Sequence, residues 1–263
     1  MTLVRHFGRI EAFGFATAGI AALLVAWALL PDFFGVSTFL VPRVDTVVIA
    51  FWRSRRAILV HGGITATAGL FAIASAILSA LALACATALS SHIKAALTPL
   101  IVIGQALPKV VLIPFLFLIL KDARLPGMIV GALIAFFPTY LTLQYSIETI
   151  PQGMLDLSEV WGYSRWRTLK EIAIPYAIPA AVSTIGLAWV YSLIGVLSAE
   201  LLHPSRGLGF LLDQAQNRLD TETFFSVAIG CLVLALTGWI LASMIDSAVR
   251  RRFRVSGQRT LFL

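Results

Sequence analysis

The sequence predicts an all-α polytopic membrane protein with six transmembrane helices, and three observations support this fold class. First, 59% of the 263 residues are hydrophobic and only 13% are charged, whereas about a quarter of the residues of a soluble domain are charged. Second, the apolar residues gather in blocks of about 20 or more, the length of a membrane-spanning helix. Third, the alternating strands of about ten residues that build a transmembrane barrel do not occur.

The six helices follow from the apolar blocks in chain order. A helix rises about 1.5 Å per residue, so each block can cross a hydrocarbon core of about 30 Å. The second block is rich in alanine, glycine and serine. Small residues allow close helix packing in lipid, so we expect this block inside the bundle rather than facing lipid. The predicted spans are 13–31, 63–90, 97–120, 126–147, 177–200 and 224–246, within one transmembrane domain over 13–250.

The basic ends of the chain predict how the spans are oriented. Six spans place both termini on one side of the membrane, and lysine and arginine favour the cytoplasmic side. The N-terminal segment 1–12 contains Arg5 and Arg9, and the tail 251–263 begins within the run RRRFR. We therefore expect both termini in the cytoplasm.

Residues 32–62 fit this orientation less well, because they would be external. They contain four arginines, Arg43, Arg53, Arg55 and Arg56. Residues 45–58 have the pattern of an amphipathic helix lying in the membrane interface. In that arrangement Trp52 would sit at headgroup depth and the arginines would extend outward.

Several functions lack their sequence requirements. The net charge of +7 is explained by arginines at membrane edges, so we expect no nucleic-acid partner. No GxxxxGK[ST] phosphate loop occurs, so we expect this chain to bind no ATP and no other cofactor. No convergent catalytic residues are visible, so we expect no enzyme. His61, His92 and His203 have no ligand spacing, so we expect no metal site. Cys85 and Cys231 lie in apolar runs and are interpreted as small buried hydrophobic residues.

The segment 148–176, called the polar loop below, interrupts the apolar blocks with DLSEVWGYSRWRTLKEIAIP. Pro151 suits the first turn of a helix, and Gly162 can adopt the positive φ of a turn. Ser164 can cap a second helix, and Pro175 and Pro179 mark where that helix passes into the next span. The prediction is a helix–turn–helix at the membrane surface that suits a partner. The alternative is an ordinary solvated connection.

The polar loop resembles the EAA loop of ABC importer permeases. Asp156 takes the acidic position, Leu157 and Ser158 the two small positions, and Gly162 the glycine position. Ile172, Ile174 and Pro175 take the closing positions, and the spacing matches throughout. Aspartate, Leu157 and Ile174 replace the usual residues, and Leu157 is the largest departure, because it bears on close packing of the first short helix. The resemblance implies that an ATPase contacts this loop, with Glu159, Tyr163, Ser164 and Arg165 as further contact residues.

The resemblance extends over residues 40–250 to the permeases of the nitrate, sulfonate and taurine group. Its ordered segments include VPRVDTVVIAFW, ALPKVVLIPFLFLIL, GALIAFFPTYL and GLAWVYSLIGVLSAELL. It implies the type I importer permease fold in a bacterial inner membrane. It also implies a second permease subunit in a homodimer, two copies of an ATPase subunit that bind ATP and Mg, and an extracytoplasmic substrate-binding protein.

Five residues are candidates for a translocation pathway or gate: Gln105, Pro108, Lys109, Pro114 and Glu200. Lys109 is the one charge deep within a predicted span, and a charge there is a functional hypothesis by default. The two prolines can kink or break the helix and free carbonyls around it. The alternative is a structural lysine that binds those carbonyls. Glu200 is interpreted either as a gate or as a partner of Arg206 or of the backbone after the GLG turn.

The substrate class follows from the resemblance rather than from these residues. The resemblance favours a sulfonate, taurine or nitrate, and related permeases suggest a heterocyclic or aromatic solute as the alternative. A membrane scaffold without transport activity is a further alternative, which would need neither Lys109 nor the polar loop.

Overall fold

A computed structural model describes residues 9–253, and within them the chain is helical with no strand. The predicted cytoplasmic segments 1–12 and 251–263 therefore fall largely outside the described residues. The elements are α1 (Arg9–Phe33), α2 (Val44–Leu89), α3 (Ser91–Ala106), η1 (Lys109–Val111), α4 (Leu112–Leu120), α5 (Leu125–Glu148), α6 (Gln152–Val160), α7 (Arg165–Thr168), η2 (Leu169–Ala173), α8 (Ile174–Leu202), α9 (Leu208–Asn217) and α10 (Thr221–Phe253).

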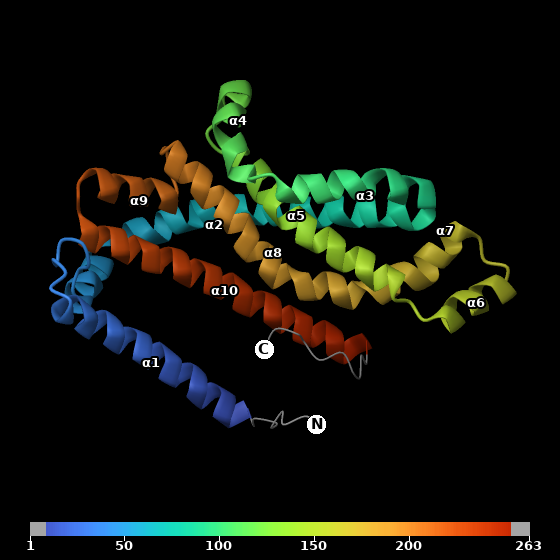
Figure 1. Cartoon of the computed structure of the whole chain (residues 1–263), viewed down its shortest axis with the longest axis horizontal. Coiled ribbons are helices and arrows are strands. Elements are labelled where there is room, and N and C mark those ends of the chain that lie inside the picture. Colours follow the sequence, from blue (N-terminus) through green and yellow to red (C-terminus); the bar gives the residue numbers. More distant parts are fainter. Residues whose placement is uncertain (1–8, 254–263) are drawn as a thin grey trace.

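Four stretches of helix are long and apolar enough to cross a membrane within the described residues: Val44–Leu89, Leu125–Glu148, Arg165–Leu202 and Thr221–Arg251. A fifth span results if α3 and the η1–α4 pair are counted together. The apolar stretch of α1, Thr17–Leu29, is shorter. The long helices run along the molecule, with α9 at one end and α6 and α7 at the other (Figure 1). The all-α membrane fold is confirmed.

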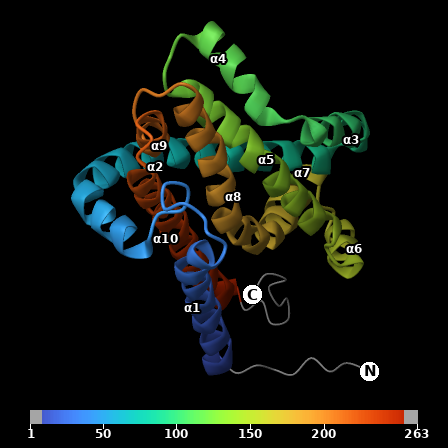
Figure 2. The same cartoon turned by 60° about the vertical axis from the view of Figure 1, so that its left-hand side comes forward.

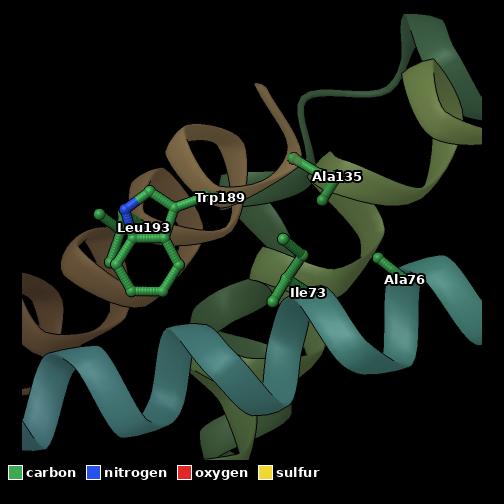
Figure 3. Packing of buried hydrophobic residues seen from close by; sticks show 6 residues of the cluster. Ile73, Ala76, Ala135, Trp189 and Leu193 are labelled. Atoms are coloured by element: carbon green, nitrogen blue, oxygen red, sulfur yellow. The ribbon is translucent and has the colours of Figure 1, made fainter. Parts of the chain in front are cut away.

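The alanine-rich part of α2 lies inside the bundle, as its composition predicted. Ala72, Ala76 and Ala80 recur at four-residue spacing and are fully buried, because residues four apart lie on one face of a helix. Ile73 and Ala76 of α2 pack with Ala135 of α5 and with Trp189 and Leu193 of α8 in one buried cluster (Figure 3). Trp189 also donates from its indole Nε1 to the Leu234 carbonyl of α10 at 3.4 Å, which joins four helices at one residue.

Helices α5 and α8 approach closely at two glycines. A methyl group built on Gly131 would lie 2.6 Å from the Ser192 carbonyl oxygen, and one built on Gly195 would collide with the Gly131 backbone. Without hydrophobic driving force in lipid, such close backbone contact is what holds membrane helices together.

The N-terminal part of α2 contains residues 45–58, for which the sequence predicts an amphipathic helix in the membrane interface. These residues are helical, and Val44–Leu89 is one continuous helix of 46 residues, so the segment runs without a break into the apolar part of α2. The helix curves strongly toward its N-terminal end (Figure 2). Gly62 and Gly63 are adjacent in this helix, and paired small residues are a common cause of helix bending. The place of residues 45–58 in the membrane interface stays a prediction.

The third predicted span, 97–120, is not one straight helix. Its halves are bent by 78° at Leu107 and Pro108. Leu107 is extended at φ −69° and ψ 131°, as a residue before proline prefers. Pro108 breaks the helix as expected, whereas Pro114 lies in the first turn of α4, where a proline is tolerated.

The second short helix passes into α8 without a break. η2 is a π-helical turn that continues into α8, which has Pro175 in its first turn and Pro179 inside it. Pro175 donates no backbone hydrogen bond and its ring crowds the preceding turn, which suits the wider π turn. The second short helix and the span are consequently one continuous helical stretch, Arg165–Leu202.

Candidate functional site

The polar loop forms two short helices, α6 and α7, joined by a tight turn at Gly162. Gly162 has φ +66°, a conformation that favours glycine. Its N–H donates to the Glu159 carbonyl at 2.9 Å, and the Tyr163 N–H donates to the Ser158 carbonyl at 2.9 Å. These two bonds form a Schellman motif, which ends α6 with its carbonyls satisfied.

Ser164 begins the second helix as its N-terminal cap. Its hydroxyl oxygen accepts from the Arg167 N–H at 3.3 Å, as the sequence predicted. The Arg167 guanidinium lies over the Tyr163 ring at 4.1 Å from its centroid. The turn, the cap and this cation–π contact together fix the angle between the two arms.

Ser158 lies where the two arms meet. It is buried, its hydroxyl donates to the Leu155 carbonyl at 2.7 Å, and the Thr168 hydroxyl of α7 donates to it at 3.4 Å. A small residue is therefore required at this position. Leu157, by contrast, is 49% exposed, so the unusual leucine points away from the contact and does not disturb it.

The polar loop is anchored to the transmembrane helices by its own apolar cluster. Ile150, Leu169 and Ala173 are buried together. The partly buried residues packed against them come from the loop and from the ends of α2 and α5: Cys85, Leu89, Ile147, Leu155, Ile172, Ile174 and Tyr176. The predicted closing residues of the motif thus form the joint between the loop and the membrane helices.

The outward face of the polar loop combines charged and apolar side chains. Asp156, Glu159 and Arg165 are exposed, and Asp156 accepts only from Gln152 of its own helix, at 3.0 Å. Large apolar side chains are exposed beside them, with Val160 at 81%: Met154, Val160, Trp161 and Trp166. Sequence reasoning had not named these four, although the alternation of the first three with acidic residues in MLDLSEVW was the available signal.

Lys109 lies at the break between α3 and α4. Its Nζ donates to the Gln105 carbonyl oxygen at 2.9 Å and lies 4.7 Å from the centroid of the Phe137 ring. The break leaves carbonyls without helical donors, and the lysine satisfies one of them. The contact with Gln105 runs through the backbone, and the Gln105 side chain is exposed.

Glu200 is the centre of a second polar cluster, at the α9 end of the molecule. The Thr65 hydroxyl of α2 donates to Glu200 Oε2 at 2.9 Å, and the Gly209 N–H donates to the same oxygen at 3.0 Å. The Leu208 N–H donates to Thr65 Oγ1 at 2.9 Å. The sequence left two local roles open for Glu200, capping of the backbone at the GLG turn or an ion pair with Arg206. The structure contains the first, since the Gly209 N–H donates to Glu200. No ion pair with Arg206 occurs within residues 9–253.

His61 also belongs to this cluster, which is called the Glu200 network below. Its Nδ1 accepts from the Gly207 N–H at 3.1 Å, and its ring stacks on Phe210 at 5.5 Å between centroids. Sequence reasoning missed Thr65 as the partner of Glu200 and His61 as the partner of the Gly207 N–H, because both lie more than 130 positions earlier in the chain and carry no local signal. The network ties α9 to α2 and α8.

The structure does not join Lys109 to Glu200 by any hydrogen bond or ion pair among the described residues. A cavity of about 20 Å³ lies beside Glu200, lined among others by Ile64, Gly127 and Arg206. This volume holds about one water molecule, so it is too small for an organic anion. Within residues 9–253, no group of three or more His, Cys, Asp or Glu is placed to hold a metal ion.

Comparison with protein families identifies the class. Residues 76–255 match the family described as "Binding-protein-dependent transport system inner membrane component", so the chain belongs to this family of ABC importer permeases. The match begins within α2 and includes both the polar loop and Glu200. The family assignment confirms the resemblance seen in the sequence.

Individual relatives are more distant. A probable ABC transporter permease protein of Haemophilus influenzae is 29% identical over 60% of this chain and 66% of its own length. The riboflavin transport system permease protein RibX of Chloroflexus aurantiacus is 26% identical over 59% and 58%. The taurine transport system permease protein TauC of Escherichia coli is 22% identical over 73% and 68%. The chain thus aligns with about three-fifths to two-thirds of the length of these relatives.

Solved structures agree with the type I importer fold. An inward-facing MetNI methionine ABC transporter has a TM-score of 0.59 at 17% identity, covering 75% of this chain and 96% of that chain. An amino acid ABC transporter crystallised with histidines has a TM-score of 0.63 at 16% identity, covering 78% and 97%. At these identities the likeness concerns the fold alone.

Proposed function

We propose that this chain is the transmembrane permease subunit of an ATP-driven importer and moves a small solute into the cytoplasm by alternating access. One observation carries the proposal: the polar loop presents an exposed charged and apolar face on a scaffold fixed to the ends of α2 and α5. Such a face suits a partner protein, and the rigid joint behind it suits transmission of that partner's movement.

The partner is an ATPase subunit, present in two copies, that binds ATP and Mg. The exposed side chains of α6 and α7 dock into a groove of this subunit, with Asp156, Glu159 and Arg165 as polar contacts and Val160 and Trp161 as apolar ones. Because α7 and η2 continue into α8 without a break, closure of the ATPase dimer would tilt α7 and α8 as one lever. This chain itself would hydrolyse no ATP.

In this proposal the polar loop and both termini lie in the cytoplasm, and the α9 end faces outward toward a substrate-binding protein. The chain lies in a bacterial inner membrane and pairs with a second permease, as a homodimer. Exposed apolar side chains along α2, α4 and α10 agree with contact to lipid and to that second subunit.

For the solute we propose a small anion such as a sulfonate, taurine or nitrate, with a heterocyclic solute as the alternative that the riboflavin relative suggests. The resemblance supports the anion, and the Lys109 ammonium is compatible with it, because a cation beside freed carbonyls can attract a negative group once the pathway opens. Pro108, Gln105 and Pro114 would shape that segment, and Glu200 would gate the outer end.

Co-purification with an ABC ATPase subunit from the same cells tests the proposal. Val160→Asp places a charge at the most exposed apolar side chain of the polar loop, so the amount of ATPase recovered should fall. Leu219→Asp is the matched control, since Leu219 is equally a large exposed apolar residue, at 68% exposure, but lies at the α9 end. Its ATPase recovery should equal that of the wild type.

The outcomes separate the competing functions. Recovery of ATPase with the wild type, followed by uptake of the solute in reconstituted vesicles, supports an importer. If the wild type recovers no ATPase, and the two variants recover none either, the chain is a membrane scaffold instead. ATP hydrolysis by the purified chain alone would contradict the proposal that a separate subunit hydrolyses ATP.

A further inference from the structure

A mixed arginine and apolar face lies on the N-terminal part of α2, residues 44–60, outside the features used above. Trp52, Arg55 and Leu59 follow one helical stripe, and Arg53, Arg56 and Val60 follow the adjacent stripe, since residues three and four apart share a face. All six side chains are exposed, with Leu59 at 75% and Trp52 at 62%. These six residues are called the arginine face.

The opposite side of the same segment is the packed side. Val47, Ala50 and Ile58 are buried, and Ile58 packs with Leu208 of α9 and Val227 of α10. The orientation of the helix is therefore set by the bundle, and the arginine face is held outward by this packing. It is a fixed surface at the α9 end.

Among the side chains that the structure describes, the arginines of this face have no acidic partners. The ion pairs within residues 9–253 are Arg43–Asp45, Lys94–Glu148 and Arg250–Asp246. Arg55 donates to the carbonyl of Trp52 in its own helix, at 2.5 Å. Arg53 and Arg56 thus extend guanidinium groups whose planar forks match phosphate oxygens.

We propose that the arginine face binds the headgroups of anionic phospholipids at the membrane edge. Leu59, Val60 and Trp52 would lie among acyl chains and headgroups, and the arginines would reach the phosphates above them. Arginine is ordinarily placed at the cytoplasmic edge, so a cluster at the opposite edge calls for local anionic groups. In the orientation proposed above, those groups belong to the outer leaflet of the inner membrane.

Charge argues against a second copy of this chain as the occupant. A two-fold contact through the arginine face would place identical residues of both copies next to each other, and like charges in an interface oppose association. A soluble protein would have to cover Leu59, Val60 and Trp52 as well as neutralise three arginines. An anionic lipid satisfies both requirements with one molecule.

Lipid retention by the purified full-length chain tests the proposal independently of membrane orientation. The chain in detergent is given equal amounts of phosphatidylglycerol and phosphatidylcholine, and bound lipids are counted by native mass spectrometry. Phosphatidylglycerol should be retained preferentially. Arg53→Gln with Arg56→Gln should reduce this retention by about tenfold or more, because each arginine near an anionic surface contributes about a fivefold effect.

A charge-matched control distinguishes this face from the general charge of the molecule. Lys121→Gln with Arg218→Gln removes two exposed basic residues at the same end and should leave retention unchanged. Equal retention of the two lipids, or unchanged retention in the Arg53/Arg56 variant, would overturn the proposal. Competition by inorganic phosphate at millimolar concentration would also overturn it, since the ligand would then be a soluble anion.

A fluorescence measurement locates the lipid even if the double variant assembles poorly. Phosphatidylglycerol with brominated chains should quench the wild-type tryptophan emission more than that of Trp52→Phe. Equal quenching in both proteins would place the lipid elsewhere and contradict the proposal. If the double variant keeps its phosphatidylglycerol but loses affinity for the substrate-binding protein, the face docks a protein, and the lipid assignment is wrong.

Discussion

The Glu200 network and the polar loop lie at opposite ends of the molecule and use acidic side chains in opposite ways. Glu200 accepts hydrogen bonds from Thr65 and from the Gly209 N–H, all within the fold. Asp156 and Glu159 are exposed, and Asp156 accepts only from a neighbour on its own helix. Removing an acid whose partners are buried leaves those partners unsatisfied, whereas removing an exposed acid does not.

Glycine shows the same contrast between the two ends. Gly207 and Gly162 both have positive φ, at +97° and +66°. A methyl group on Gly207 would collide with the Glu200 carboxylate, while one on Gly162 would meet nothing within 4 Å. The difference indicates that the α9 end is a closed joint and the polar loop an open surface. The predictions below test this contrast in order of expected loss of stability.

Gly207→Val should have the largest effect, lowering stability by about 3–5 kcal/mol through backbone strain and collision with Glu200. Thermal unfolding of the detergent-purified chain measures it. Gly35→Val is the matched control, because Gly35 also has positive φ, at +61°, but has nothing within 4 Å. Gly35→Val should lower stability through backbone strain alone. An equal loss of stability in both variants would refute the collision with Glu200.

Glu200→Ala should follow, at about 2–4 kcal/mol, since it leaves the Thr65 hydroxyl and the Gly209 N–H without their acceptor. Asp156→Ala is the comparison at the other end and should change stability by less than about 0.5 kcal/mol. The same unfolding measurement applies. If both acids proved equally important for stability, the distinction between the closed and the open end would fail.

Gly162→Val should lower stability by only about 1–2 kcal/mol, from the strain of a positive φ. Its main effect should be on coupling, because the angle between α6 and α7 depends on this turn. Uptake in reconstituted vesicles should fall by about tenfold, within the usual range of coupling energies, while ATP hydrolysis continues. Gly153→Val, in α6 with nothing within 4 Å, provides the control, and normal uptake by the Gly162 variant would argue against the docking role.

Lys109→Ala should change stability by about 1 kcal/mol, the value of one hydrogen bond to the Gln105 carbonyl. If Lys109 also attracts the solute, Lys109→Ala should lower uptake by more than the loss of stability explains. Lys109→Arg, which keeps the positive charge, should restore part of the uptake. Apparent affinity and maximal rate for uptake are the readouts. Wild-type values for both would leave Lys109 a purely structural residue.

Asp122 should have the smallest effect, visible only in acid. Its carboxylate accepts from the Leu125 and Arg124 N–H groups at the start of α5, and these bonds lower the pKa of Asp122. A lowered pKa stabilises the fold above the ordinary carboxyl pKa of about 4, and this contribution is lost as the pH falls through the lowered value. Asp122→Asn should therefore flatten the stability profile below pH 4, and an unaltered profile would show that the cap is unimportant.

Sequence reasoning succeeded where the signal was local. The turn at Gly162, the cap at Ser164 and the helix break at Pro108 each follow from the backbone preferences of single residues, and each occurs in the structure. The alanine stripe of α2 was also predictable, because small residues mark the inside of a membrane bundle.

It failed where the outcome depended on distant segments. Thr65 meets Glu200 across 135 positions, and no local pattern in either segment reveals this. The sequence predicted an amphipathic segment at 45–58 and a membrane span that begins at 63, whereas the structure joins both in the one helix α2. Ile58 of this helix packs against Leu208 of α9 and Val227 of α10, which are about 150 or more positions away.

The sequence by itself determined the membrane class, the family motif of the polar loop and the turn that shapes it, because hydropathy, helix capping and glycine conformation act over a few neighbouring residues. Only the tertiary structure decided which polar groups are buried with partners and which face outward. That choice depends on how the helices pack, so Glu200 became part of a closed joint while the acids of the polar loop stayed exposed. The arginine face belongs to the same category, since packing of the opposite side of α2 is what holds it outward.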